Sequence, residues 1–463
     1  MDIENILNKI TRHKILVVGD AILDFNVFLD YEKKSQEADI NVYKYLKEDY
    51  SLGGACNVAT NLKLAKQDVS FVSIVGLDYK ENIIATQLED YDINYHLIRE
   101  NNRKTTLKTR YYSLNHEQIF RFDDEDNFDI SNEIADEIIS FILDNKPELI
   151  VISDYHKGVV TPYLLEEIRK LNIKVVIDPK SDSFEKYKGF DVIKPNLLEL
   201  KTMTNKSCET KEEIEDVLKE VSSSFDIPSI FVTLGNQGAI YFNNNKAHYL
   251  SAFKEKKIDV SGAGDSVLAY LAVSLVNNLN EEETLTLTNY VGSKKVKQKR
   301  ATPVDINHLT GKIVDIDKID IIRQKHPNSK IVFTNGCFDL FHAGHLYSLK
   351  EASKLGDILV VGVNSDSSIK RLKGNNRPIV NLNERLEILE NLVVVDYLIP
   401  FDDDTPIKII KKLIPDVLVK GEEYKDKEVV GSDIVINNGG KVILIPMKEG
   451  YSTTNMIKKI KDE

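Results

Sequence analysis

The sequence has no tryptophan, three cysteines and four methionines among its 463 residues. The cysteines, Cys56, Cys208 and Cys337, are odd in number and far apart, so neither a disulfide framework nor a cysteine metal site is expected. It also lacks any run of about 18 apolar residues, which a membrane-spanning helix requires. The opening stretch, MDIENILNKITRHK, includes acidic residues where a signal peptide has a basic start and an apolar core. We therefore expect a cytoplasmic protein with reduced thiols and no membrane partner.

The sequence has fewer basic than acidic residues, with 61 lysines and arginines against 73 aspartates and glutamates. The formal net charge is therefore -12. Binding to a nucleic-acid backbone depends on neutralising contacts from Lys and Arg, so we expect no nucleic-acid partner. The basic run KKVKQKR, residues 294–300, fits a solvated helix face or a linker better than a nucleic-acid site. Any anionic substrate must therefore be bound by local features.

Apolar runs alternate with amphipathic helical patterns over about the first 310 residues. Strands are predicted at 14–19, 149–153, 175–178, 192–194 and 230–234, and helices at 133–143 and 211–221. Such alternation implies a parallel sheet with helices on both faces. Ligands of such sheets bind beyond the carboxyl ends of the strands.

Two glycine-containing segments lie in this region. GGACN, residues 53–57, follows a polar stretch at 33–50 that we expect to form a lid, although a glycine pair alone is more often a turn. DVSGAGDS, residues 259–266, precedes an apolar helix predicted at 267–276. Small residues at a helix start leave N–H groups for a phosphoryl group, and Asp265 is placed to accept a proton from an attacking hydroxyl. The alternative is that Asp265 only caps the helix.

Together, GGACN and DVSGAGDS resemble the paired signatures of the ribokinase-like (PfkB) sugar kinases. The resemblance implies a three-layer α/β domain with a small β lid, ATP as phosphoryl donor, and Asp265 as catalytic base. The anion hole would be formed by Gly262, Ala263 and Gly264. The sugar would be contacted by Asp24, Gly54 and Asn57.

Two further segments match this family. Asn196 and Glu199, in KPNLLEL, match its NxxE motif, which helps to organise Mg²⁺ and phosphate, with Glu199 as an indirect metal contact. Without the resemblance they would be a helix cap and its capping-box partner. Thr233 and Gly235, in VTLGNQG, resemble the segment beside the nucleotide.

The resemblance narrows to the kinase half of the bifunctional heptose enzymes through SDYHKG at 153–158, DPK at 178–180 and LKTRYYSLNHEQIFRFD at 107–123. It implies a sugar that already carries a phosphate. The residues suited to that phosphate are Arg110, Arg121, Lys157 and Lys180. The sequence departs from this subgroup twice: His156 stands in place of a glycine, and the segment 292–304 replaces a glycine-threonine segment near the nucleotide.

The stretch IVFTNGCFDLFHAGH, residues 331–345, reads as a buried strand, a turn and the start of a helix. His342 and His345 share one face of the first helical turn, where the helix dipole attracts anions, although two histidines could also simply cap the helix. HxGH after a strand resembles the signature of a nucleotidyltransferase superfamily. That resemblance makes His342 and His345 stabilisers of the α-phosphate charge, with Asn335 and Gly336 lining the phosphate site.

The last 90 residues continue in the order of that superfamily. Lys373 is a candidate phosphate contact, and a final helix is predicted at 456–460. The hydroxyl residues that begin this helix would bind the β- and γ-phosphates, or would be ordinary caps if considered alone: Ser452, Thr453 and Thr454. No protein nucleophile is needed, because the acceptor's phosphate oxygen attacks the α-phosphate in line.

We therefore predict a ribokinase-like domain at 1–310, a linker at 311–328 and a Rossmann-like nucleotidyltransferase domain at 329–463. Nearly the whole chain resembles the family of bifunctional heptose 7-phosphate kinase and heptose 1-phosphate adenylyltransferase. This implies ATP and Mg²⁺ as cofactors and sugar phosphates as substrates. It also implies a homodimer formed through the kinase lid, at residues 39–50.

Two alternatives stay open. One keeps both chemistries but uses another sugar or polyol phosphate, with CTP as the nucleotide donor, because the HxGH scaffold also serves cytidylyltransferases. The other is a nucleotide-binding protein with one or both sites inactive. The presence of Asp265, His342 and His345 counts against the second alternative.

Overall fold

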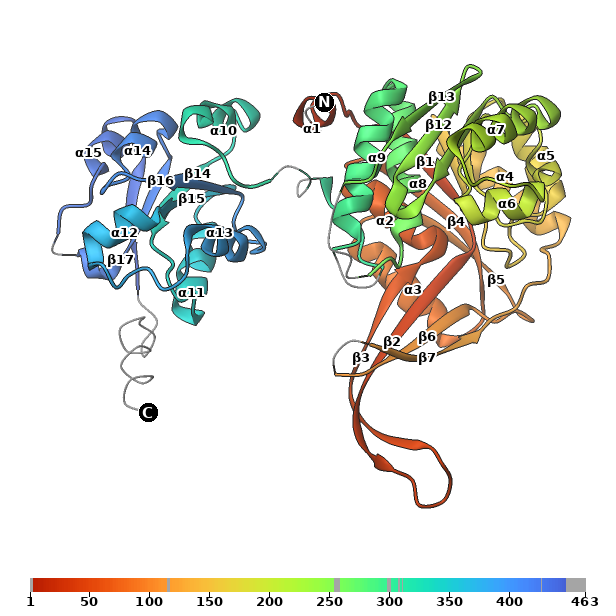
Figure 1. Ribbon diagram of the computed structural model, residues 1–463, viewed down its shortest axis with the longest axis horizontal. Helices are drawn as coiled ribbons and strands as arrows, with labels where there is room; N and C mark the ends of the chain where they lie inside the picture. Colours follow the sequence, from red (N-terminus) through yellow and green to blue (C-terminus); the bar gives the residue numbers. More distant parts are fainter. Residues whose placement is uncertain are drawn as a thin grey trace. The chain divides into compact units, whose positions relative to one another are not determined.

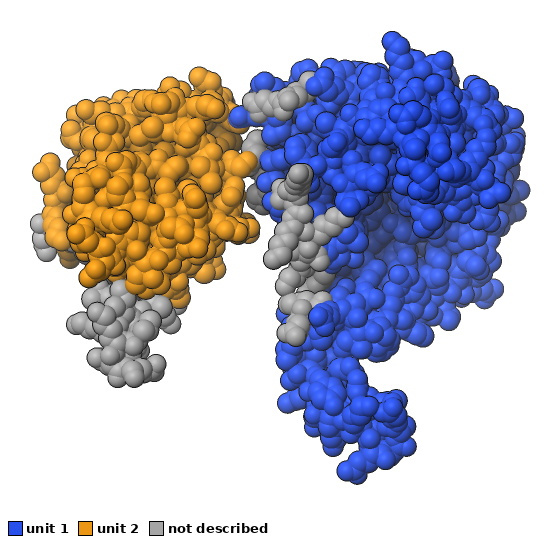
Figure 2. Space-filling view, viewed as in Figure 1, with its two compact units in different colours: residues 1–310 blue, residues 311–463 orange. Residues whose placement is uncertain are grey.

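The computed structural model describes residues 3–446 except 115–116, 254–258, 298–300, 307–308, 310 and 426. The chain forms two compact units, residues 1–310 and 311–463, coloured separately in Figure 2. Among the described residues, no helix combines the length and apolarity needed to cross a bilayer. Each unit is described by itself below.

The first unit is built on a nine-stranded sheet, in the order β13-β12-β11-β10-β9-β8-β1-β4-β5. Strand β1 lies inside the sheet, and the residues of its ILVV run are buried because helices cover both faces. The strands run parallel except for β12, which is antiparallel to both of its neighbours, β11 and β13. Their bounds are β1 Lys14–Gly19, β4 Asp68–Gly76, β5 Asn94–Glu100, β8 Leu149–Ser153, β9 Lys174–Asp178, β10 Val192–Ile193, β11 Ser229–Thr233, β12 Ala239–Asn243 and β13 Lys246–Leu250.

Two apolar cores, one on each face of this sheet, join it to the helices. One core includes α2, α8 and α9, and α8 is buried nearly all round, as expected for its continuous apolar run. The other includes α4, α5 and α7. The helices are α1 Ile3–Leu7, α2 Gly54–Leu64, α3 Tyr79–Asp90, α4 Asn132–Asn145, α5 Pro162–Lys170, α6 Leu197–Thr204, α7 Lys211–Phe225, α8 Ala263–Val276 and α9 Glu281–Lys295.

A separate four-stranded sheet, in the order β3-β2-β6-β7, forms the lid of the first unit. Its strands are β2 Ala21–Lys34, β3 Asn41–Gly53, β6 Thr106–Tyr112 and β7 Gln118–Asp124. The hairpin of β2 and β3 extends well beyond the rest of this unit (Figure 1). The register pairs Asp24 with Lys108, Lys108 with Asp123, and Arg110 with Arg121. Because successive side chains alternate in direction, these charged residues share one face of the lid.

The second unit is a five-stranded parallel sheet, in the order β16-β15-β14-β17-β18, with apolar cores on both faces. Its strands are β14 Ile331–Gly336, β15 Ile358–Asn364, β16 Tyr397–Phe401, β17 Val417–Gly421 and β18 Lys441–Ile445. Its helices are α10 Asp320–Lys325, α11 Ala343–Ser353, α12 Asp366–Lys373, α13 Leu382–Glu390, α14 Ile407–Leu413 and α15 Ser432–Asn437.

The predicted fold class is confirmed, but two details of the prediction are wrong. The segment 311–328, predicted as a linker, belongs to the second unit, because Ile319 and Ile322 are buried in its core. The basic run at 294–300 is not simply solvated: Lys295 ends α9 with no exposed surface, and burial lowers its pKa to about 8. The final helix predicted at 456–460 lies outside the described residues.

Candidate active sites

Asp265 lies in the first turn of α8, directly after the glycine-rich segment. Gly262 is the N-cap, with φ at +72°, and a Cβ there would come within 2.8 Å of the Asn57 side-chain nitrogen. Glycine is needed at this position for both reasons. Of the three predicted anion-hole residues, Ala263 donates its N–H to the Val260 carbonyl at 3.2 Å. The N–H groups of a first helical turn have no partner within the helix and attract anions.

The carboxylate of Asp265 is buried and hydrogen-bonded at both oxygens. Tyr155 donates its hydroxyl to one oxygen at 2.6 Å, and Asn57 donates its side-chain N–H to the other at 2.7 Å. Burial raises the pKa of Asp265, while these two hydrogen bonds oppose the rise by stabilising the charged form. The predicted base therefore has the fixed position and raised basicity that a general base needs.

Gly54 starts α2 beside this site. Its φ is +54°, and a Cβ there would come within 2.7 Å of the Asp20 carbonyl oxygen. The glycine pair in GGACN thus turns the chain from lid strand β3 into α2, which brings Asn57 to Asp265. The glycine pair is therefore a turn, as the alternative interpretation has it. This same turn places Asn57 at the site.

A cavity of about 780 Å³ opens next to Asp265. It is lined by most of the residues of the first unit that are predicted to bind nucleotide. Asn196 and Glu199 form a complete capping box for α6, so their structural interpretation is correct, and they also line this cavity. The cavity is further lined by Thr233, Gly235, Ala263 and Gly264. Gly292, Ser293 and Val296, from the segment that departs from the subgroup, contribute to its wall.

Carboxylates that could serve Mg²⁺ face the same cavity. Glu199 accepts a hydrogen bond from Lys180 at 3.1 Å, and Asp178 forms an ion pair with Lys194 at 3.0 Å. Burial raises the pKa of Asp178 to about 7, against the effect of the Lys194 ammonium. Oxygen donors are the ligands that Mg²⁺ takes, and few protein donors suffice when phosphates supply the rest. Among the described residues no group of three or more acidic, histidine or cysteine side chains could hold a metal ion alone, so these two carboxylates fit Mg²⁺ only together with phosphate oxygens.

Cations and carboxylates pair across the lid face that carries Asp24. Asp24 is buried and forms an ion pair with Arg110 at 2.6 Å, while Arg121 pairs with Asp123 on β7. Lys157 pairs with Glu125, just beyond that strand, at 2.6 Å. Lys180, the fourth cation predicted for a sugar phosphate, instead lines the cavity that holds Asn196 and Glu199.

Lys108 was not identified from the sequence, yet it belongs to this cluster. It lies in register with Asp24 and Asp123, and burial and the nearby Arg121 lower its pKa. Its ammonium lies 5.1 Å from the centre of the Tyr155 ring. The alternation of Lys108 and Arg110 along one strand was the available signal, because residues two apart share a face.

In the second unit, the HxGH segment has the geometry expected for binding a phosphate. His342 is the N-cap of α11 and accepts the Gly344 N–H on Nδ1 at 3.1 Å. The rings of His342 and His345 stack, with centroids 3.9 Å apart and planes 17° apart. The cap interpretation is thus correct for His342, and the shared face is confirmed. Burial, followed by His342 and Lys373, lowers the pKa of His345 to about 4, so the ring is neutral at pH 7.

The two histidines line a cavity of about 600 Å³ together with the predicted residues Asn335, Gly336 and Lys373. Lys420, at the end of β17, also lines it and donates a hydrogen bond to the Asn335 side chain at 2.5 Å. The prediction did not include Lys420, although its lysine-glycine turn ends a strand of the same parallel sheet. Ser452, Thr453 and Thr454 lie outside the described residues.

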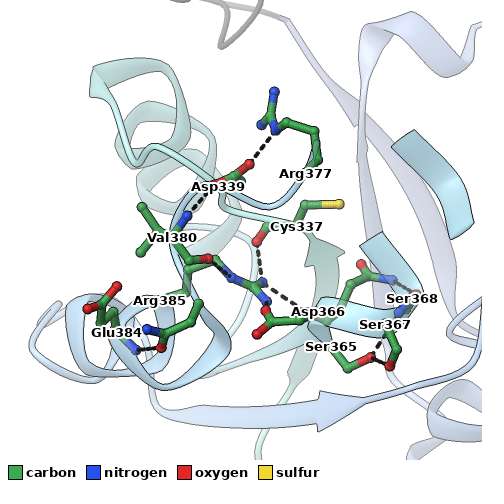
Figure 3. A network of polar contacts seen from close by, with 12 residues as sticks. Cys337, Asp339, Ser365, Asp366, Ser367, Ser368, Arg377, Val380, Glu384 and Arg385 are labelled. Carbon is green, nitrogen blue, oxygen red and sulfur yellow. Dashed lines mark hydrogen bonds and ion pairs between the residues drawn. The ribbon is translucent and has the colours of Figure 1, made fainter. Parts of the chain in front are cut away.

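A buried arginine joins chain segments that also line this second site, and Figure 3 shows it with its partners. Arg385, on α13, is 1% exposed and donates to the carbonyl oxygens of Cys337, Asn364 and Val380 and to the carboxylate of Asp366. One guanidinium thus joins the loop that precedes HxGH, the end of β15 and the start of α12. The sequence did not single out Arg385, since its partners are distant along the chain.

Replacing Arg385 with methionine is expected to destabilise the second unit by about 3–5 kcal/mol, because it leaves a carboxylate and three buried carbonyls without their donor. The melting transition of this unit should fall by on the order of 10 °C in calorimetry. Arg371→Met is the matched control: Arg371 pairs with Asp404 at the surface, where such pairs contribute less than about 1 kcal/mol. Equal small effects of both variants would contradict the structural role of Arg385.

Comparisons with known proteins match each of the two units. Residues 12–308 match the pfkB family carbohydrate kinase, and residues 333–459 match the cytidylyltransferase-like family. The first unit shares its fold with Arabidopsis thaliana ribokinase complexed with ribose and ATP, at a TM-score of 0.52, 20% identity, and coverage of 63% of this chain and 96% of that chain. Phosphofructokinase-2 from Escherichia coli in complex with potassium gives a TM-score of 0.55 at 16% identity, covering 63% and 94%. Fold and sites together define a carbohydrate kinase joined to a nucleotidyltransferase.

Relatives align over nearly the full length. The bifunctional protein HldE of Campylobacter concisus is 38% identical over 97% of this chain and 98% of its own length. The HldE proteins of Aliarcobacter butzleri and Geotalea uraniireducens are 36% and 34% identical, covering 97% and 99% of this chain and 98% of each relative. The chain belongs to the HldE family of bifunctional proteins. The predicted function, heptose 7-phosphate kinase and heptose 1-phosphate adenylyltransferase, is thereby confirmed.

Proposed function

We propose that Asp265 is the catalytic base of the kinase reaction. It takes the proton of the anomeric hydroxyl of D-glycero-β-D-manno-heptose 7-phosphate as the oxygen attacks the γ-phosphorus of ATP. The supporting observation is its buried carboxylate in the first turn of α8, next to the 780 Å³ cavity. The N–H groups of Gly262 and Gly264, and that of Ala263 once it releases the Val260 carbonyl, stabilise the charge of the transferred phosphoryl group. The products are ADP and the heptose 1,7-bisphosphate.

The nucleotide lies along the cavity in this proposal. Thr233 and Gly235 contact ATP, and Lys180, Asn196 and Glu199 lie near its phosphates. When bound there, Mg²⁺ neutralises the phosphate charge, with Glu199 as an indirect contact and Asp178 within the same cavity. This changes the role predicted for Lys180, from the sugar's phosphate to the phosphates of ATP.

The charged face of the lid receives the acceptor. Asp24, Gly54 and Asn57 contact the sugar, while Arg110, Arg121 and Lys157 contact its 7-phosphate. In the structure these three cations pair with carboxylates, so the substrate phosphate competes for groups that are already ordered. Lys108 adds a further positive charge to this face.

Arg121→Gln is expected to raise KM for heptose 7-phosphate by about 10- to 100-fold, because a charge-assisted hydrogen bond contributes about 1.5–3 kcal/mol. KM for ATP should stay unchanged. Lys104→Gln is the control: this surface lysine pairs with Asp124, whose side chain points to the opposite face of the lid from Asp123. Steady-state kinetics with varied heptose 7-phosphate makes the test. A similar rise for both variants, or for neither, would count against a phosphate site on this face.

The second unit then transfers AMP from ATP to heptose 1-phosphate, giving ADP-heptose and pyrophosphate. His342 and His345 stabilise the charge that develops on the α-phosphate, and Asn335, Gly336 and Lys373 contact the nucleotide's phosphates. Ser452, Thr453 and Thr454 bind the β- and γ-phosphates. Between the two reactions, a separate phosphatase removes the 7-phosphate. The cytidylyltransferase-like match keeps CTP as the rival donor, which a nucleotide panel distinguishes.

Two further proposals concern the protein in the cell. The protein works in the cytoplasm, a compartment that supplies ATP and suits three free thiols. It forms a homodimer through the lid, because the side that faces away from Asp24 exposes Phe120 and Phe122 and the hairpin exposes Tyr31 and Tyr45. Sedimentation equilibrium of the full chain tests the dimer: a monomer at micromolar concentration would contradict it.

A further inference from the structure

The loop after β8, residues 154–159, is held rigidly under the kinase site. The buried carboxylate of Asp20 accepts the backbone N–H groups of Tyr155 at 2.7 Å, Lys157 at 3.2 Å and Val159 at 3.3 Å. Asp154 accepts the N–H of His156 at 2.8 Å. The backbone on both sides of Tyr155 is therefore fixed by four hydrogen bonds.

The same loop contains His156, one of the two departures of the sequence from the subgroup. His156 has a φ of +59°, in the left-handed region where glycine is favoured. The chain keeps the glycine-like conformation with a histidine, at some cost in strain. The hydrogen bonds to Asp20 and Asp154 hold the loop in this conformation, and with it the backbone of Tyr155.

The Tyr155 side chain joins three parts of the kinase site. Its hydroxyl donates to Asp265 at 2.6 Å, and its ring lines the 780 Å³ cavity. Above the ring lies the ammonium of Lys108, from lid strand β6. Burial and the neighbouring Asp265 raise the pKa of the Tyr155 phenol well above 10. The hydroxyl therefore stays protonated at neutral pH and acts as a donor to the carboxylate.

A carboxylate held at one oxygen can still rotate about its bond to Cβ, whereas one held at both oxygens cannot. Asn57 holds one oxygen of Asp265 and Tyr155 holds the other. Each oxygen keeps a second lone pair, whose direction is set by the fixed plane. The precise direction of that lone pair matters because proton transfer requires an aligned donor and acceptor.

We propose that Tyr155 is a positioning residue of the kinase: its hydroxyl fixes the plane of the Asp265 carboxylate so that the carboxylate faces the acceptor hydroxyl. This rests on the proposed role of Asp265 as the base. Tyr155 contacts the base and remains protonated throughout the reaction. No signal in the sequence pointed to this role, since Tyr155 and Asp265 are 110 positions apart.

Tyr155→Phe tests the proposal in the full-length protein. We expect kcat of the kinase reaction to fall by about 10- to 100-fold, as small misplacements of catalytic groups cost rate. KM for heptose 7-phosphate and ATP should stay within about twofold of wild type. Loss of the hydroxyl also removes a donor that stabilises the charged carboxylate, so the acid limb of kcat/KM should move to higher pH. The charged neighbours Asp24 and Lys194 also act on Asp265 but are unchanged in the variant.

Tyr270→Phe is the matched control. Tyr270 is on α8 too, is fully buried, and donates its hydroxyl to the Val304 carbonyl at 3.0 Å rather than to the base. The substitution removes a buried tyrosine hydroxyl without touching Asp265, so kcat should change only through stability and the acid limb should stay in place. Thermal unfolding of the first unit checks that each variant is folded, and the rate of adenylyl transfer confirms that equal amounts of intact protein are compared.

Each result of this experiment either supports the positioning role of Tyr155 or contradicts it. A fall in kcat with the shifted acid limb in Tyr155→Phe alone supports the positioning role. An unchanged kcat, an unchanged acid limb, or a rise in KM alone would overturn it, the last by making Tyr155 a substrate contact. A wild-type protein without sugar-kinase turnover would overturn the proposed role of Asp265 and the role of Tyr155 with it. An active wild type with an unaffected Tyr155→Phe overturns only the latter.

Discussion

Asp265→Asn is expected to lower kcat of heptose 7-phosphate phosphorylation by about 10³-fold, because an amide cannot accept the proton of the attacking hydroxyl and general-base catalysis contributes about 10²- to 10⁴-fold. The substitution keeps the shape of the side chain, so binding of ATP in the neighbouring cavity should persist. ADP release in a coupled assay measures the loss. Adenylyl transfer in the same preparation should be unchanged, since its site lies in the other unit.

Asp265→Asn is a conservative change, so we do not expect unfolding to account for the loss of activity. A carboxylate with a raised pKa is replaced by a neutral amide of equal size, so the buried site loses a charge rather than a packing contact. The thermal stability of the first unit should be kept or slightly increased. A variant that keeps more than a tenth of the wild-type kcat would show that Asp265 is not the base.

His345→Ala is expected to lower kcat of the adenylyl transfer by about 10²- to 10³-fold, as does the loss of one donor to a developing oxyanion in other enzymes. His345 is partly buried in the cavity and stacks on His342, and the Nδ1 of His345 has no hydrogen-bond partner among the described residues. This nitrogen is therefore not committed to the fold in the described part of the chain. Pyrophosphate release measures the rate, and the kinase rate serves as the internal reference.

His326→Ala is the matched control for that experiment. His326 ends α10 in the same unit, where it hydrogen-bonds to the Tyr397 hydroxyl rather than lining the cavity. Its replacement should change the rate of adenylyl transfer less than about threefold. If His345→Ala were as active as His326→Ala, the charge on the α-phosphate would have to be stabilised by other groups, with Lys420 the first candidate.

Residues that lie within one local motif could be predicted from the sequence. DVSGAGDS and HxGH each span a helix start, so the placement of Asp265, His342 and His345 follows from short-range geometry. The parallel sheets could also be predicted, because each apolar run and each amphipathic helix is a local pattern and their alternation implies this sheet type. For Asn196 and His342 the structural interpretation was correct as well, because Asn196 caps α6 and His342 caps α11. For Asp265 it was wrong, because Gly262 is the N-cap of α8 and Asp265 lies inside the helix. A cap and a binding residue use the same end of a helix.

Residues whose role depends on distant partners could not be predicted. Tyr155 and Arg385 act through contacts with chain segments far away in the sequence, and Lys420 reaches Asn335 only because β14 and β17 are neighbours. Lys295 was predicted to be exposed to solvent, because it lies in a basic run. The packing of α9 buries that one side chain. Lys180 was predicted to contact the sugar's phosphate, and it lines the cavity that holds Asn196 and Glu199, because charge alone does not say which cavity a lysine lines.

The measurement that tests the central claim most directly is phosphorus NMR of the full-length protein in two mixtures. With Mg²⁺, ATP and heptose 7-phosphate, the account predicts ADP and a sugar bisphosphate, lost in Asp265→Asn and kept in His345→Ala. With heptose 1-phosphate and each nucleoside triphosphate, it predicts pyrophosphate and a nucleotide sugar from ATP alone, lost in His345→Ala and kept in Asp265→Asn. Turnover with CTP in place of ATP, or one variant abolishing both reactions, would contradict two independent sites with this division of chemistry.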